Sequence, residues 1–411
     1  MLIAHLNRKR REREAAGLWR QLRVTETACA PSTLLQAHTG AAERRLAFCS
    51  NDYLGLAAHP AIVDALIEGA RRWGAGSGAS HLVSGHSRAH ALLEDRLGAL
   101  FASHIPDACA LLFCSGFAAN LALLTTLGDG DATILADKLN HASLVDGGLL
   151  AAARMHRYPH GRLDLLAARL AECTSTVKLI VTDSVFSMDG DLAPIPELLA
   201  LAEAHDAWLI IDDAHGFGVL GAGGRGAVEH FGLAGERLIV MGTLGKAAGV
   251  SGAFVVAHPA VIDALIQGGR SYIYTTAMPP ALAHALSASL TLIDSPEGAA
   301  RRATLRTLIA HLRRGLLAVI DAHRPAGWHL GESATAIQPL IVGDNQAALA
   351  MAAELEQHGL WVPAIRPPTV ATGSARLRIS LSAAHTVADV ERLCAALAQL
   401  AAGATARSAR A

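Results

Sequence analysis

Seven short apolar runs recur between residues 110 and 257, and Ala- and Leu-rich stretches separate most of them. Most of these runs are continuously apolar rather than alternating, which indicates strands buried on both faces. Strands spaced by helices predict an α/β fold, with a mostly parallel seven-stranded sheet covered by helices. The runs are "ALLFCS" (110–115), "ATILAD" (132–137), "RMHRYP" (154–159), "KLIVTDSV" (178–185), "WLIIDD" (208–213), "RLIVMG" (237–242) and "GAFVVA" (252–257).

The length of the chain predicts more than one domain. Its 411 residues are too many for one simple core, and 52% of them are hydrophobic. We expect an N-terminal arm over residues 1–45, a large domain over 46–290 and a smaller α+β domain over 291–411. The net charge of −1 lacks the basic footprint of a nucleic-acid-binding protein.

Cysteine usage and the N-terminal segment predict a cytoplasmic protein. The six cysteines form no C-x-x-C pair and no metal-finger spacing, so we expect reduced thiols and no metal site. The start, "MLIAHLNRKRREREAAGLWRQLR", is charged from Asn7 onward and lacks a long apolar region, so we expect no signal peptide. No uninterrupted apolar stretch has the length of a membrane span.

The segment "DDAHGFGVLG" (212–221) contains a glycine pattern with two competing interpretations. Residues 216–221 fit G-x-G-x-x-G, the pattern of a nicotinamide dinucleotide site. In such a site the first glycine directly follows the strand and a helix begins near the third. Here Asp212, Asp213 and His215 intervene, and a glycine-rich stretch follows. A nicotinamide-dependent dehydrogenase is therefore the disfavoured alternative.

The acids suggest a different cofactor, pyridoxal 5'-phosphate (PLP). A carboxylate at the end of a buried strand is costly unless it meets a positive group. Asp212 could pair with the protonated ring nitrogen of PLP, and His215 could donate to its phenolic oxygen. The simpler interpretation is that an acid caps a turn and His215 is solvated. This segment alone does not separate the two.

A lysine favours the PLP interpretation. Lys246 follows the next strand in the glycine-bordered loop "GTLGKA" (242–247), where its amine could reach the aldehyde of PLP. Thr243 offers a hydroxyl to the phosphate. Lys138, just past "ATILAD", is a second candidate for the cofactor lysine.

Three other strand ends carry candidate cofactor contacts. Gly116 and Phe117 lie in "CSGFAAN" (114–120), where a helix N-terminus would aim free N–H groups at a phosphate. His141 could stack on the pyridine ring, and Ser187 could hydrogen-bond to the ring oxygen. A loop histidine and a turn serine are the simpler alternatives.

These segments together resemble the α-oxoamine synthases, which are fold-type I PLP enzymes. The matching motifs are "NDYLGL" (51–56), "SGFAAN" (115–120), "NHASLVDG" (140–147), "SVFSMDGD" (184–191), "DDAHGFGVLG" (212–221), "GTLGKA" (242–247) and "ARLR" (375–378). They stand in the family's order, and the match runs from about Arg20 to Thr386. The resemblance implies a homodimer with its active site at the subunit interface.

The resemblance also implies residue roles. The catalytic residues would be Lys246, which binds PLP covalently, with His141, Asp212 and His215. The cofactor contacts would be Gly116, Phe117, His141, Ser187, Asp212, His215, Thr243 and Lys246, with Thr275 or Thr276 reaching the partner subunit's phosphate. The substrate contacts would be Arg20, Asn51, His141, Arg366, Thr369 and Arg378. Arg378 is the first candidate for the amino acid carboxylate and Arg366 the second, and Arg23 is the alternative to Arg20.

The reaction implied by the family is the decarboxylative condensation of an amino acid with an acyl thioester. Three segments, "YIYTTAMPP" (272–280), "AIQPLIVGDN" (336–345) and "AIRPPTV" (364–370), are similar to members that join L-alanine to a pimeloyl thioester. The acyl carrier would be coenzyme A or an acyl-carrier protein. Members that use glycine or serine with other acyl chains are the alternatives. One departure is Phe217, where the family often has threonine.

Overall fold

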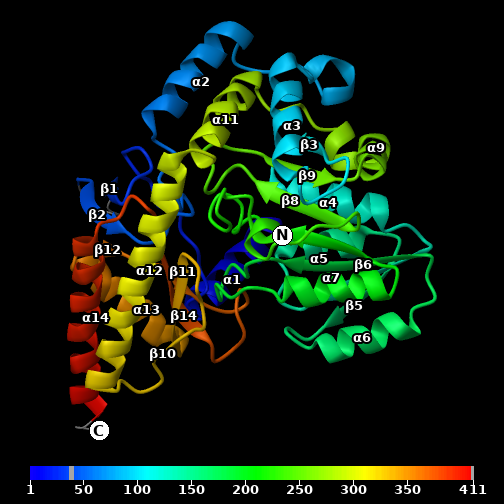
Figure 1. The fold of residues 1–411 in the computed structure, drawn as a ribbon. Coiled ribbons are helices and arrows are strands. Elements are labelled where there is room, and N and C mark those ends of the chain that lie inside the picture. The colour runs from blue at the N-terminus through cyan, green and yellow to red at the C-terminus, as the bar shows by residue number, and fades with distance from the viewer. Residues whose placement is uncertain (37–40, 409–411) are drawn as a thin grey trace. The chain divides into compact units, whose positions relative to one another are not determined.

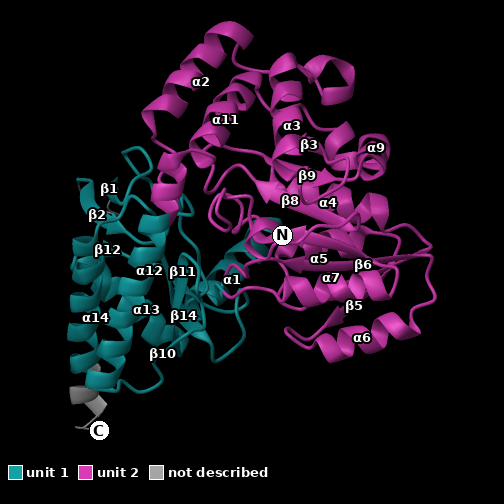
Figure 2. Cartoon of the chain, viewed as in Figure 1, with its two compact units in different colours: residues 1–53, 188–190, 303–411 teal, residues 54–187, 191–302 magenta. Residues whose placement is uncertain are grey.

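The computed structural model describes residues 1–36 and 41–408. The chain divides into two compact units (Figure 2). Unit 1 comprises Met1–Tyr53, Met188–Gly190 and Ala303–Ala411, and unit 2 comprises Leu54–Ser187 and Asp191–Arg302. Residues 1–45 are thus grouped with the C-terminal part of the chain, because an N-terminal strand pairs with a C-terminal one.

Unit 2 is built on the seven-stranded sheet that the sequence predicts (Figure 1). The strand order is β3-β9-β8-β7-β6-β4-β5. Only β9 runs antiparallel to its neighbours, so the other six strands point the same way. The strands are β3 (Cys109–Phe113), β4 (Ala132–Asp137), β5 (Arg154–Tyr158), β6 (Val177–Asp183), β7 (Trp208–Asp212), β8 (Leu238–Thr243) and β9 (Ala253–Ala257).

Helices cover both faces of this sheet. Successive side chains of a strand point to opposite faces of the sheet. All residues of β4 and β9, and most residues of β8, are buried. Helix α4 packs on β3, β8 and β9, and α7 packs on β7. The helices of unit 2 are α2 (Pro60–Trp73), α3 (Arg88–Phe101), α4 (Gly116–Leu127), α5 (Ala142–Leu150), α6 (Leu163–Glu172), α7 (Ile195–Ala204), α8 (Ala227–His230), α9 (Pro259–Gly268), α10 (Arg270–Ile273) and α11 (Pro280–Ile293), with a π-helical turn at His81–Gly85.

Local sequence signals set where helices begin. Ser115 caps α4, since its side chain accepts a hydrogen bond from the backbone N–H of Ala118 at 3.2 Å. His59 caps α2 in the same way, with Pro60 in the first turn. Each cap places the start of a helix directly after a loop.

Unit 1 contains two smaller sheets and long helices. One sheet has the order β1-β2-β12 and the other β10-β11-β14-β13. Helix α12 (Pro296–His323) begins in unit 2 and continues into unit 1. The remaining elements are α1 (Leu2–Ala15), β1 (Ser32–Leu35), β2 (Glu43–Ala47), β10 (His329–Leu330), β11 (Ile337–Gly343), α13 (Asn345–Gln357), β12 (Leu360–Trp361), β13 (Ala364–Ile365), β14 (Ala375–Ser380) and α14 (Val387–Ser408).

The described residues show neither a membrane-spanning helix nor a metal-binding cluster. None of their helices is long and apolar enough to cross a bilayer. Within the same ranges, no group of three or more His, Cys, Asp or Glu side chains could hold a metal ion.

Candidate active site

The predicted cofactor residues of unit 2 follow strands that point the same way. Gly116 follows β3, His141 follows β4, Ser187 follows β6, His215 follows β7 and Lys246 follows β8. The carboxyl ends of parallel strands meet at one edge of a sheet, where ligands of such folds bind. The topology therefore brings these residues to the same edge.

The amine of Lys246 lies beside His215. The Nζ atom of Lys246 is 3.0 Å from Nε2 of His215. His215 is buried and Lys246 is half-buried. An amine and an imidazole in contact at the ends of neighbouring strands can exchange or share a proton. Lys138, the other candidate lysine, is exposed at the end of β4.

Asp212 is a buried carboxylate held by neutral donors. It is 4% exposed. Its Oδ1 accepts from the backbone N–H of Ala214 at 3.0 Å, and its Oδ2 accepts from Nδ2 of Asn120 at 2.7 Å. Over residues 1–36 and 41–408, no Lys, Arg or His forms an ion pair with it. A buried acid without a cationic partner suits a ligand that brings a positive charge, such as a protonated pyridine nitrogen.

A hydrogen-bond chain that the sequence did not predict connects Asp212 with His141. The fully buried Asn120 also donates to Oγ of Ser143 at 2.8 Å, and this oxygen lies 2.7 Å from Nδ1 of His141. The backbone N–H of His141 donates to Oδ2 of Asp183 at 2.8 Å. Asn120 is the last residue of the motif "SGFAAN", but the sequence analysis predicted no role for it.

The same edge carries a second buried acid. Burial, and then the neighbouring Asp212, raise the pKa of Asp183 well above its ordinary value. The N–H of His141 works against this rise by hydrogen-bonding to the carboxylate. The close pair of acids makes this edge a favourable place for a cation.

The predicted phosphate contacts lie where anions can be bound. The first N–H groups of a helix have no intrahelical acceptor, and Gly116 and Phe117 open α4. The hydroxyl of Thr243 donates to the carbonyl of Gly252 at 3.2 Å and accepts from the N–H of Gly245 at 3.3 Å. Of the two predicted threonines, Thr275 is half-buried, and the exposed Thr276 forms an isolated bridge with Ser80.

The glycines of residues 216–221 serve packing rather than a dinucleotide. A Cβ atom on Gly216 would lie 2.0 Å from Oδ1 of Asp213, and one on Gly226 would lie 1.6 Å from Oδ2. Asp213 accepts from the Ser184 hydroxyl at 2.5 Å and from the N–H of Ala227 at 3.0 Å. Burial raises its pKa to about 7. Gly216, inside the pattern, and Gly226, beyond it, thus make room for this buried acid.

In unit 1, β14 carries a buried arginine at the predicted carboxylate position. Arg378 is 6% exposed. Its guanidinium lies 3.3 and 3.4 Å from Oδ1 of Asn51 and donates to Oγ of Ser380 at 2.8 Å. The structure therefore brings two predicted substrate residues, Asn51 and Arg378, into contact.

Three of the other predicted substrate residues, Arg20, Arg366 and Thr369, line a cavity of about 1180 Å³ in unit 1. Arg20 donates to Oγ1 of Thr369 at 3.5 Å. Arg366 donates to the carbonyl of Gly17, and burial together with Arg20 lowers its pKa. Arg23, the alternative to Arg20, forms an ion pair with Glu356.

A family model described as aminotransferase class I and II matches residues 44–397. The chain belongs to this family. It is a PLP-dependent enzyme of fold type I, as the resemblance predicted.

Comparison with individual proteins narrows the class. An "8-amino-7-oxononanoate synthase 2" of Polaromonas sp. (strain JS666) is 66% identical over 398 residues, which cover 97% of this chain and 98% of that protein. The chain is thus grouped with the 8-amino-7-oxononanoate synthases, which are PLP-dependent acyltransferases. A solved synthase from Francisella tularensis superposes with a TM-score of 0.73 and 30% identity, covering 87% of this chain and 97% of that chain.

A related solved enzyme contains the cofactor. The serine palmitoyltransferase of S. paucimobilis with bound PLP–myriocin has a TM-score of 0.86 and 29% identity, covering 98% of both chains. Its cofactor agrees with the one predicted from Asp212, His215 and Lys246.

Proposed function

We propose that this protein catalyses the decarboxylative condensation of L-alanine with a pimeloyl thioester. The products are 8-amino-7-oxononanoate, carbon dioxide and the free carrier, as a step of biotin synthesis. The observation that carries the proposal is the 3.0 Å distance between the amine of Lys246 and Nε2 of His215. His215 closely follows Asp212, the buried acid that ends β7. The high identity to named synthases supports the choice of substrates.

The residues present fit PLP by their chemistry. Asp212 would hold the ring nitrogen, since this buried carboxylate has neutral donors on both oxygens. His215 and Ser187 would hold the ring oxygen, and His141 would stack on the ring. The start of α4, with Thr243, would hold the phosphate. Bound there, PLP supplies a sink for the electron pair released at the amino acid's α-carbon.

Lys246 has two tasks in this proposal. Its Nζ atom would anchor the cofactor before alanine binds and, once released as a neutral amine, would accept the α-proton of alanine. The neighbouring Nε2 of His215 can take a proton from that amine or return one to it. Asp212 would keep the ring nitrogen of PLP protonated, because a carboxylate favours the charged form of a nearby base.

We assign the alanine carboxylate to Arg378. A guanidinium can bind a carboxylate through two parallel N–H groups. Asn51 and Ser380 hold this guanidinium through its Nη atoms, which sets its orientation. Arg366 is the second candidate, and its buried Nε has no partner within the described residues.

The acyl substrate is assigned to the arginine-lined cavity of unit 1. Arg20 and Thr369 touch each other there, whereas the charge of Arg23 is compensated by Glu356. This supports Arg20 rather than Arg23 as the acyl contact. The carrier would be coenzyme A or an acyl-carrier protein. We further propose a cytoplasmic homodimer in which Thr275 or Thr276 contacts the phosphate bound by the partner subunit.

The decisive experiment combines a spectrum with a substrate panel. Purified protein should absorb in the band of protein-bound PLP, and L-alanine should change that band more than glycine or L-serine does. L-Alanine with pimeloyl-CoA should yield free coenzyme A and carbon dioxide in equal amounts. A preference for glycine or serine with another thioester would favour 2-amino-3-ketobutyrate ligase, 5-aminolevulinate synthase or serine palmitoyltransferase activity. A colourless protein that binds NADH would favour a dehydrogenase.

A further inference from the structure

The loop between β6 and α7 (residues 184–194) carries Ser187, and its two arms are bonded to each other. The N–H of Phe186 donates to the carbonyl of Asp191 at 3.1 Å. Val185 and Leu192 form an isolated bridge within the same loop. These bonds shape the loop, and Ser184 attaches its first residue to the end of β7, donating from its N–H to the carbonyl of Asp212 at 2.8 Å and from its hydroxyl to Oδ1 of Asp213 at 2.5 Å.

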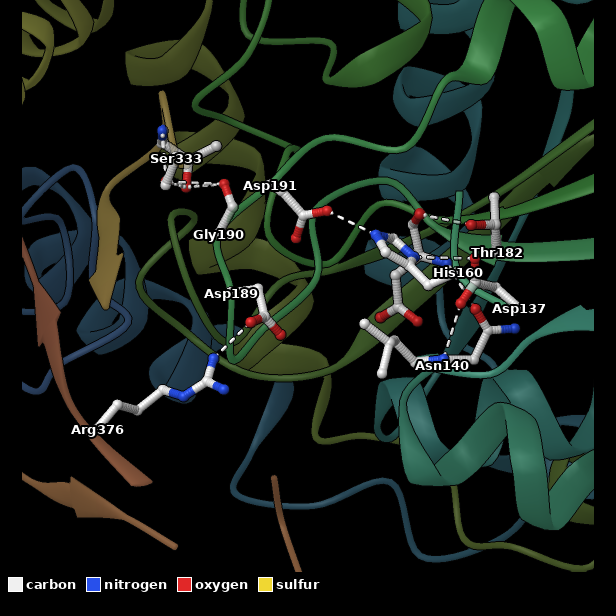
Figure 3. A network of polar contacts seen from close by, with 12 residues as sticks. Asp137, Asn140, His160, Thr182, Asp189, Gly190, Asp191, Ser333 and Arg376 are labelled. Carbon is white, nitrogen blue, oxygen red and sulfur yellow. Dashed lines mark hydrogen bonds and ion pairs between the residues drawn. The ribbon is translucent and has the colours of Figure 1, made fainter. Parts of the chain in front are cut away.

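A side chain that follows β5 makes a second attachment, at the far end of this loop. His160 follows β5, and its Nε2 lies 2.8 Å from Oδ2 of Asp191 (Figure 3). Its Nδ1 lies 3.0 Å from Oδ2 of Asp137, at the end of β4. The imidazole also packs edge-to-face on Phe186, with 4.4 Å between ring centroids.

Both contacts require the charged form of His160. A neutral imidazole has one N–H group and could donate to only one carboxylate, whereas an imidazolium donates from both nitrogens. Hydrogen bonds that His160 donates to Asp137 and Asp191 raise its pKa to about 10. The side chain is therefore a cation that bridges two acids at neutral pH.

Each acid depends on this bridge in its own way. Oδ1 of Asp191 is buried and has no partner within the described residues. The charge of this acid is therefore compensated through the contact of its Oδ2 with His160. Asp137 is 3% exposed, and its Oδ1 accepts from the N–H of Leu139 at 2.8 Å in the turn that leads to His141. His160 thus connects the loop of Ser187 with the turn before His141.

We propose that His160 is a positioning residue for the cofactor site, because its bridge between Asp137 and Asp191 sets the loop of Ser187 relative to the turn of His141. The inference rests on the proposed function, in which Ser187 and His141 contact the PLP ring. Without the bridge, Asp191 is a partly buried acid without its cation, and the loop loses its attachment to β4. Ser187 then loses one of the contacts that position its loop.

The test is a double-mutant cycle between His160→Ala and Ser187→Ala. Two readouts are the dissociation constant of PLP from the apo-protein and the pH dependence of the bound cofactor's absorbance. We expect each single variant to weaken PLP binding by about tenfold and to shift the absorbance titration in the same direction. The double variant should bind PLP about as well as Ser187→Ala alone, because the two residues act through one contact. His156→Ala, an exposed histidine on β5, is the matched control and should behave as the wild type.

A second variant, Asp191→Asn, keeps the test valid if His160→Ala fails to fold. Asp191→Asn keeps the size and one oxygen acceptor and removes the charge, so its effect should have the same direction as that of His160→Ala and a smaller size. If His160→Ala does not fold, the cycle with Asp191→Asn replaces it. Wild-type PLP affinity and titration in His160→Ala, or additive effects in the cycle, would overturn the inference. Failure of the wild type to bind PLP would instead overturn the proposed function.

Discussion

Asn120 donates from Nδ2 to Oδ2 of Asp212 at 2.7 Å, and both side chains are buried. The same Nδ2 donates to Oγ of Ser143, whose hydroxyl also lies beside the His141 ring. An amide on α4 thus orients the acid at the end of β7. In a buried site such outer contacts fix the protonation and direction of the functional group.

The first prediction concerns this amide. Asn120→Ala should lower kcat by about 10- to 100-fold, because Asp212 would keep its charge and lose its orientation. The absorbance of bound PLP should change as well, since the ring nitrogen contact is disturbed. Steady-state kinetics and spectra of the variant check this, with the exposed Asn7→Ala as control. Unchanged kcat and spectrum would argue against the assignment of Asp212.

The second prediction separates the two candidate lysines. Lys246→Ala should abolish turnover and the absorbance of covalently bound cofactor, because it removes the amine that lies beside His215. Lys138→Ala should leave both unchanged, since Lys138 is exposed. Mass spectrometry after borohydride reduction of the wild type should find the cofactor on the peptide of Lys246. Labelling of the Lys138 peptide would reverse the assignment.

The third prediction concerns the glycine pattern of residues 216–221. Gly216→Ala should destabilise the protein by about 1–3 kcal/mol, because its Cβ would overlap Oδ1 of the buried Asp213. Gly130→Ala is the control, since a Cβ there meets nothing within 4 Å. Urea denaturation of both variants measures the difference. Equal stability of the two would show that the loop adjusts and that Gly216 has another role.

The fourth prediction follows from the raised pKa of His160. The folded protein binds this proton up to a pKa of about 10, whereas an unfolded imidazole loses it near ~6.5. The stabilisation from the bridge is therefore complete below ~6.5 and is lost as the pH rises toward the folded value. The unfolding free energy of the wild type minus that of His160→Ala should fall between pH 6 and pH 10. A difference that stays constant with pH would mean that folding does not raise the pKa of this imidazole.

Local sequence was sufficient for much of the fold. Continuous apolar runs predicted six of the seven strands of unit 2, because a strand buried on both faces needs apolar residues throughout. The seventh, β5, was predicted from the largely polar "RMHRYP" and is a mostly exposed edge strand. The antiparallel direction of β9 was not predicted, although a signal existed. Only nine residues separate β8 from β9, and a parallel crossover needs about a dozen or more.

What the sequence alone determined is the kind of chemistry and the strand end at which each reactive group lies. Asp212 is the last residue of β7, and Lys246 follows the end of the neighbouring strand β8. Short-range spacing in the sequence encodes both placements. Tertiary structure alone decided the contacts that hold these groups. Asn120 and Asp212 are 92 positions apart in the sequence. Asp137 and Asp191, the two acids that contact His160, are 54 positions apart. Such pairs depend on which strands become neighbours and on how side chains pack between them, which no local pattern specifies.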